Sequence, residues 1–244
     1  TLPAPVPLPT TIPPAVAARP RMTQRIVDAV FDVVQDEAPR RPILVAGPDG
    51  VGKSRAVSDA VRIIMGESAS WAVVIHPLYN RRSAIHPFLN SLRPDGLAAT
   101  SAGLRGWERS VWEAKAPLLR ALVGEETEPR PSVCPDRLVA DFTSAYRLYL
   151  LSYVRRMDER GVPAVVVLED LQAYHPESLQ ICVSLLGDLI PMPGFAAVAT
   201  CRAGHDASAV FGTEVTAIAA PPVSLEEIRL AVEARYPGAR IPER

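Results

Sequence analysis

Eight residues near the start of the chain constrain its fold more than any other segment. They are Gly47, Pro48, Asp49, Gly50, Val51, Gly52, Lys53 and Ser54, and they satisfy the pattern G-x-x-x-x-G-K-[ST]. Glycine permits positive φ, so successive backbone N–H groups can turn inward and surround phosphate oxygens at the start of a helix. The pattern therefore predicts a phosphate-binding loop.

The flanking residues supply the context that such a loop requires. An apolar run at 42–46 precedes it, and apolar residues recur at helical spacing over 54–65. In loops of this kind the lysine reaches the β- and γ-phosphates of a nucleotide, and the hydroxyl ligates Mg²⁺. We expect Lys53 and Ser54 to take these roles. A loop that binds nucleotide without turning it over remains an alternative.

Further apolar runs alternate with helical patterns along the chain. The runs predicted as strands are 42–46, 71–75, 164–168, 195–200 and 214–219, and the helical patterns cover 22–36, 54–65, 85–92, 104–123, 136–160 and 176–190. Alternation of this kind implies crossover connections between parallel strands. We predict an α/β protein with the three-layer P-loop NTPase fold, a mostly parallel five-stranded sheet and the start of a helical lid.

The third predicted strand ends in two acids, Glu169 and Asp170. A phosphate-binding loop needs an acid at the end of a neighbouring strand to hold Mg²⁺, directly or through water, and to orient an attacking water. By order alone Glu169 would serve the metal and Asp170 the water. Adjacent strand residues point to opposite faces, however, and a turn can reorient either side chain. Both acids are therefore candidate metal and catalytic residues.

Arg202 directly follows the fourth predicted strand. Its side chain should emerge at the carboxyl edge of the sheet, where open α/β sheets bind ligands. There it could sense a γ-phosphate as a third catalytic candidate. Pairing with a local acid such as Asp206 is an equally good explanation of the arginine.

Other conspicuous side chains have simpler structural explanations. The histidines His76, His86 and His175 lack metal-ligand spacing and are interpreted as cap or turn residues. Several aromatic residues stand at helical spacing, which is typical of a core rather than of a recognition surface. They are Trp107, Trp112, Tyr146, Tyr149 and Tyr153.

Composition argues against several classes of protein. A formal net charge of −1 gives no overall attraction to nucleic acid or to an anionic membrane. Seven of the first twenty residues are proline, which would break a signal-peptide core, and no other apolar run is long enough to span a bilayer. Three widely spaced cysteines argue against disulfides and zinc. We expect a cytoplasmic protein without direct membrane or nucleic-acid contacts.

The composition also suggests three parts. Residues 1–20 read as a Pro-rich linker, 21–220 as the nucleotide-binding core and 221–244 as the start of a lid, which opens with the capping-box spacing Ser224 to Glu227. The Glu- and Pro-rich stretch 124–135 is expected to be disordered. Because the chain begins without Met and stops soon after a fresh helical pattern, we expect a piece of a longer polypeptide.

These segments together resemble the STAND class of P-loop NTPases, relatives of the AAA+ ATPases that occur in bacterial multidomain regulators and beside nucleotide cyclase domains. The resemblance rests on the loop at 47–54, the acidic pair within 165–179, the sensor-like 199–202 and the lid start at 222–227. Departures occur at Gln172, Ala173 and Tyr174, where the class has His-Trp-Ala, and at Cys201, where Tyr is common.

The resemblance implies a switch in which ATP and Mg²⁺ favour one arrangement of core and lid and slow hydrolysis resets it. Its partners would be other domains of the parent chain, with nucleotide-dependent self-association as a further expectation. The residues themselves do not distinguish ATP from GTP. A nucleotide-binding scaffold without turnover and a small-molecule kinase are the alternatives, and the acidic-pair segment fits the kinase poorly.

Overall fold

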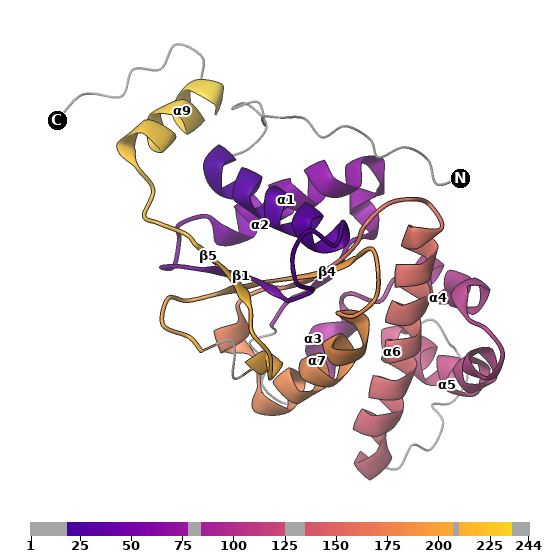
Figure 1. Ribbon diagram of the computed structural model, residues 1–244. Coiled ribbons are helices and arrows are strands. Elements are labelled where there is room, and N and C mark those ends of the chain that lie inside the picture. The colour runs from indigo at the N-terminus through magenta and orange to yellow at the C-terminus, as the bar shows by residue number, and fades with distance from the viewer. Residues whose placement is uncertain (1–18, 78–83, 125–134, 207–209, 236–244) are drawn as a thin grey trace.

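The computed structural model describes residues 19–77, 84–124, 135–206 and 210–235 (Figure 1). Nearly all of the predicted Pro-rich linker and of the stretch expected to be disordered lies outside these described residues. The described part folds into a central sheet with helices on both faces, as Figure 1 shows.

Five parallel strands form the sheet. They are β1 (Ile43–Ala46), β2 (Val73–Ile75), β3 (Ala164–Leu168), β4 (Phe195–Cys201) and β5 (Thr216–Ala219). Every residue of β3 and β4 is buried, which explains why both read as uninterrupted apolar runs. The predicted α/β class and the parallel five-stranded sheet are confirmed.

The strand order is β2-β3-β4-β1-β5, so β4 lies between β1 and β3. The register pairs Val45 of β1 with Thr200 of β4, and Leu168 of β3 with Ala199. The acidic pair follows β3, and β4 separates β3 from β1, the strand that leads into the phosphate-binding loop. The expectation that the pair follows a strand next to β1 is therefore wrong. Local periodicity identifies a strand but not its neighbours, since pairing depends on residues far away in the sequence.

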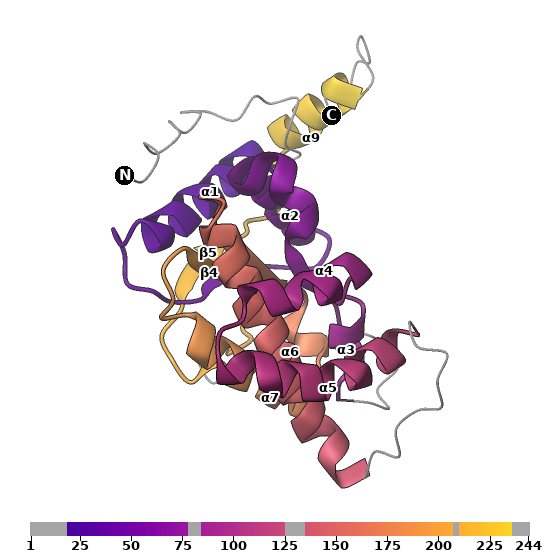
Figure 2. The same cartoon turned by 90° about the vertical axis from the view of Figure 1, so that its right-hand side faces the viewer.

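Helices cover both faces of the sheet. One face carries α1 (Pro20–Val34) and α2 (Lys53–Met65), and the other carries α3 (His86–Leu89), α6 (Pro135–Asp158) and α7 (Pro176–Leu189) (Figure 1). Outside α6 lie α4 (Pro94–Ala99) and α5 (Trp107–Val123), as Figure 2 shows. Short 3₁₀ turns span Gly66–Trp71, Thr100–Gly103 and Leu171–Ala173, and α9 (Leu225–Arg235) closes the described chain.

Local sequence accounts for several helix starts. Pro176 occupies the first turn of α7, and the His175 ring accepts a hydrogen bond from the Glu177 N–H, which confirms its predicted cap role. At α9 the predicted capping box is present: the Glu227 N–H donates to the Ser224 hydroxyl at 3.1 Å, and the Ser224 N–H donates to Glu227 at 3.0 Å. Among the described residues, no helix is both long and apolar enough to cross a membrane.

An aromatic cluster forms the core between α3 and α6. Phe88, Phe142, Tyr146 and Tyr149 lie with neighbouring ring centroids 5.4–5.9 Å apart. Burial raises the pKa of Tyr146 well above its ordinary value, so the ring stays neutral in this core. The core prediction is confirmed for four of the five aromatics named above but is wrong for Trp107, which is 71% exposed at the start of α5.

Candidate nucleotide-binding site

The loop at 47–54 connects β1 to α2, as the sequence predicts. Gly50 and Gly52 have φ values of 75° and 84°, which an L side chain rarely adopts. At Gly47 the constraint is space, because a Cβ there would lie 2.4 Å from the carbonyl oxygen of Ala220. These glycines therefore let the backbone turn tightly between β1 and α2, close to the end of β5.

Lys53 is buried at the first position of α2, with 6% of its surface exposed. Its Nζ donates hydrogen bonds to the carbonyl oxygens of Gly47 at 3.1 Å and Pro48 at 2.8 Å. Two carbonyl dipoles supply less negative charge than a phosphate would. The ammonium group thus lies across the loop, where an anion held by the loop would meet it.

Asp170 turns the chain sharply after β3. Its backbone is left-handed, with φ 50° and ψ 57°, a conformation that is unfavourable for a non-glycine residue. The Asp170 N–H donates to Thr200 Oγ1 at 2.8 Å, and Gln172 Nε2 donates to Asp170 Oδ1 at 3.3 Å. Because Thr200 is fully buried on β4, the turn is fixed from the core side.

Arg202 follows β4 and contacts the loop itself. Its Nε and Nη2 bind the two carboxylate oxygens of Asp49 at 3.0 and 2.8 Å. Both side chains remain about three-fifths exposed, at 62% and 60%. The Arg202 N–H also donates to Gln172 Oε1 at 3.1 Å, so this amide bridges the turns after β3 and β4.

Glu169 takes a different direction from Asp170. Its Oε2 lies 3.1 Å from His76 Nδ1, and it lines a separate cleft of about 520 Å³ beside α2 and β2. Adjacent residues at a strand end point to opposite faces, and the left-handed turn at Asp170 adds to this separation. The structure therefore brings Asp170, but not the Glu169 side chain, to the phosphate-binding loop.

The loop opens onto a cleft of about 570 Å³. Its lining residues are Asp49, Gly50, Gly52, Lys53, Ser54, Arg55, Asp170, Gln172, Ala173 and Arg202. Gly47, Pro48 and Val51 belong to the same loop but are not among the residues that line the cleft.

This donor set fits a nucleotide phosphate chain with Mg²⁺. The glycine-containing loop at the start of α2 and the Lys53 ammonium group suit phosphate, while the Ser54 hydroxyl and the Asp170 carboxylate supply the hard oxygen ligands that Mg²⁺ prefers. Sequence reasoning missed Gln172 and Thr200 as supports of the site. A polar residue near the end of an otherwise apolar run is the sequence signal that could have identified Thr200.

Comparison with known proteins places the chain in a family. Residues 16–198, well over half of the chain, match the AAA ATPase domain family. The solved structures of Cdc6p from Pyrobaculum aerophilum (16% identity, TM-score 0.46) and of the Aeropyrum pernix Orc1 protein in complex with DNA (15% identity, TM-score 0.48) are similar over 95% and 96% of this chain. The chain spans about half of each, 52% and 51%. Curated proteins give no match. The chain belongs to the AAA ATPase domain family.

Proposed function

We propose that this chain is the nucleotide-operated switch module of a larger regulator, which binds ATP with Mg²⁺ and hydrolyses it slowly. The observation that carries the proposal is the single cleft in which the loop, Lys53, Ser54, Asp170 and Arg202 meet. Membership of the AAA ATPase domain family supports nucleotide binding. The resemblance to STAND regulators supports the signalling role and the choice of ATP.

The loop residues bind and orient the phosphates in this proposal. Backbone N–H groups of the loop and the Lys53 ammonium hold the β- and γ-phosphates, while Ser54 and Asp170 hold Mg²⁺. Bound Mg²⁺ neutralises charge on the phosphate oxygens. Lys53 exchanges its two carbonyl partners for phosphate oxygens, so that its buried charge gains a full counter-charge.

Arg202 acts as the γ-phosphate sensor in this proposal. To reach a terminal phosphate its guanidinium leaves Asp49, and because that pair is exposed the exchange is inexpensive. Asp49→Asn should therefore raise the ratio of ATP to ADP affinity severalfold, whereas Arg202→Ala should bring that ratio close to one. Competition binding with both nucleotides measures the ratio, and an unchanged ratio in both variants would refute the sensor role.

The two acids take separable roles. Asp170 lines the cleft and is held by Thr200, so we assign it to the Mg²⁺ and water of the bound nucleotide. Glu169 can join the site only by leaving His76. Asp170→Asn should lose Mg²⁺-dependent binding and phosphate release together. Glu169→Gln should retain binding, and its rate of phosphate release then shows whether Glu169 enters during turnover.

The deciding experiment compares the only two lysines of the chain. Lys115 lies in α5 and pairs with Asp141, away from the cleft lining, so Lys115→Ala is the matched control for Lys53→Ala. Binding of labelled ATP and GTP and release of phosphate are followed in the same samples across Mg²⁺ concentrations. Loss of binding in Lys53→Ala alone supports the proposal. Tight binding without any release favours a scaffold, and no binding by folded wild type refutes a nucleotide site.

A further inference from the structure

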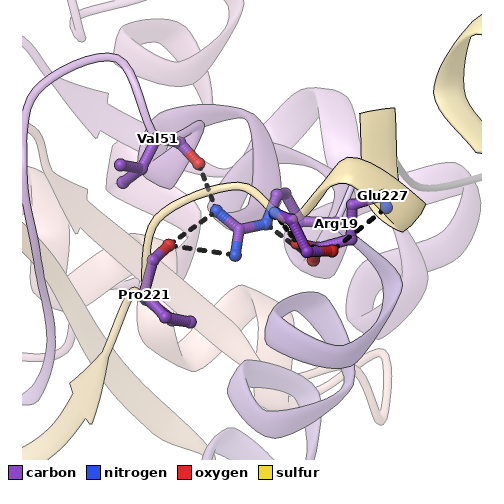
Figure 3. Close-up of polar contacts among 5 residues, drawn as sticks. Arg19, Val51, Pro221 and Glu227 are labelled. Carbon is purple, nitrogen blue, oxygen red and sulfur yellow. Dashed lines mark hydrogen bonds and ion pairs between the residues drawn. The ribbon is translucent and has the colours of Figure 1, made fainter. Parts of the chain in front are cut away.

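Arg19 is a charged residue buried to an unusual degree immediately before α1, with only 4% of its surface exposed. A buried guanidinium is tolerated only when its N–H groups find acceptors. Nε donates to Glu227 Oε1 at 3.0 Å, and Nη1 donates to the carbonyl oxygen of Val51 at 2.6 Å. Nη1 and Nη2 both donate to the carbonyl oxygen of Pro221, each at 3.1 Å (Figure 3).

The acceptors belong to three functionally different segments. Val51 is in the phosphate-binding loop, Pro221 is in the connection from β5 to α9, and Glu227 is in the first turn of α9. The aliphatic stem of Arg19 also lies over the loop, because its Cγ is 3.5 Å from the position that a Cβ on Gly52 would occupy. One side chain therefore contacts the phosphate-binding loop, the connection from β5 to α9 and the first turn of α9 (Figure 3).

Glu227 links this arginine to the start of α9. While its Oε1 accepts from Arg19, its Oε2 accepts from the Ser224 N–H at 3.0 Å as part of the capping box. Burial by itself would raise the pKa of Glu227, but the Ser224 hydrogen bond and the charge of Arg19 leave that pKa below its ordinary value. The carboxylate is thus charged at neutral pH and engaged on both sides.

Hydrophobic packing does little to fix the first turns of α9, the part of this helix that holds nearly all of its described side chains. The side chains of Leu225 and Ile228, both apolar, are 78% and 41% exposed in its first turns. In both overall views α9 lies outside the layers of the sheet and its covering helices, near the start of α1 (Figures 1 and 2). Polar contacts of Glu227 with Arg19 and Ser224 therefore hold the first turn of α9.

We propose that Arg19 is a positioning residue that couples the phosphate-binding loop to α9, an arrangement that we call the Arg19 clasp. A shift of the Val51 carbonyl when phosphate occupies the loop changes the guanidinium geometry, and with it the hold on Pro221 and Glu227. Coupling between sites is reciprocal, so a change at α9 must also alter the loop. The nucleotide dependence of the clasp rests on the proposed function, whereas the contact itself does not.

Amide hydrogen exchange tests the clasp through two reporter segments, 47–54 and 225–235. Glu227→Gln keeps the size of the side chain and weakens its bond to Arg19, and Glu226→Gln is the matched control, since Glu226 is exposed in the same turn. Without nucleotide, Glu227→Gln should speed exchange severalfold in both segments, and Glu226→Gln in neither. Glu227 does not line the nucleotide cleft, so an effect of Glu227→Gln on 47–54 must pass through Arg19. Faster exchange in 225–235 alone would therefore overturn the clasp.

Two arginine variants extend the test to the bound state. With saturating Mg²⁺ and ATP, wild type should change exchange in both segments. Arg19→Gln should keep the change in 47–54 and lose it in 225–235. Arg19→Lys keeps the charge but not the planar fork, and should restore only part of the response. If wild type binds no nucleotide the proposed function fails, while the comparison of Glu227→Gln with Glu226→Gln still decides the clasp.

Discussion

Replacement of Thr200 by valine isolates the hydrogen bond that fixes the acidic turn. Thr200 is fully buried at the end of β4, and its Oγ1 accepts the Asp170 N–H at 2.8 Å. Valine has nearly the same shape, so Thr200→Val removes the acceptor without opening a cavity. The left-handed conformation of Asp170, with φ 50°, then lacks the contact that fixes it, and the turn can relax.

The expected loss of stability follows from the hydrogen bond that Thr200→Val removes. A partly buried N–H group left without a partner costs about 1–3 kcal/mol. Each kcal/mol corresponds to roughly 2–4 °C in Tm for a chain of this size. We therefore expect Thr200→Val to lower the Tm by about 4–8 °C, taking 2 kcal/mol as the central value of that range. Thr200→Ser keeps the hydroxyl, loses one methyl group and should cost about 1 kcal/mol.

Thermal unfolding and phosphate release on the same variants test this reasoning. Thr200→Val should slow release strongly because the Asp170 turn relaxes, whereas Thr200→Ser should keep most of the rate. A Thr200→Val protein as stable as wild type, or equal slowing in the valine and serine variants, would refute the assigned role of the hydrogen bond.

Three further predictions concern glycines and acid stability. Gly47→Ala should lower the unfolding free energy by about 1–3 kcal/mol and weaken nucleotide binding, because its Cβ would lie 2.4 Å from the Ala220 carbonyl oxygen; thermal unfolding and titration measure both. Gly187→Ala, in α7 with nothing within 4 Å of the new Cβ, should instead gain about 0.5–1 kcal/mol in thermal unfolding. Glu108→Gln tests pH dependence. A hydrogen bond from Arg155 lowers the Glu108 pKa below its usual 4.5, so this carboxylate stabilises the fold above that pH and ceases to do so as the pH falls through its folded pKa. Urea unfolding between neutral pH and pH 3 should show wild type losing more stability than Glu108→Gln; parallel curves would contradict this.

Features that depend on neighbouring residues were predictable from the sequence. The strand-loop-helix context of 47–54 follows from an apolar run, glycine spacing and helical periodicity, and the capping box of Ser224 and Glu227 spans only three positions. The parallel sheet was predictable because alternating strands and helices leave few other ways to connect. The short helix at 94–99 was missed, since six residues are too few to establish a helical period.

The tertiary structure decided which of these side chains share a site. It placed β4 between β1 and β3, which lets Thr200 hold the Asp170 turn and brings Arg202 to Asp49 across 153 positions of sequence. It also separated Glu169 from Asp170, although the two are adjacent in the chain. Local propensity acts over a few residues, whereas these contacts depend on strand order and on the direction that each turn takes. The sequence by itself therefore determined the class of fold and the phosphate-binding segment, and only packing decided which acid and which arginines meet that segment.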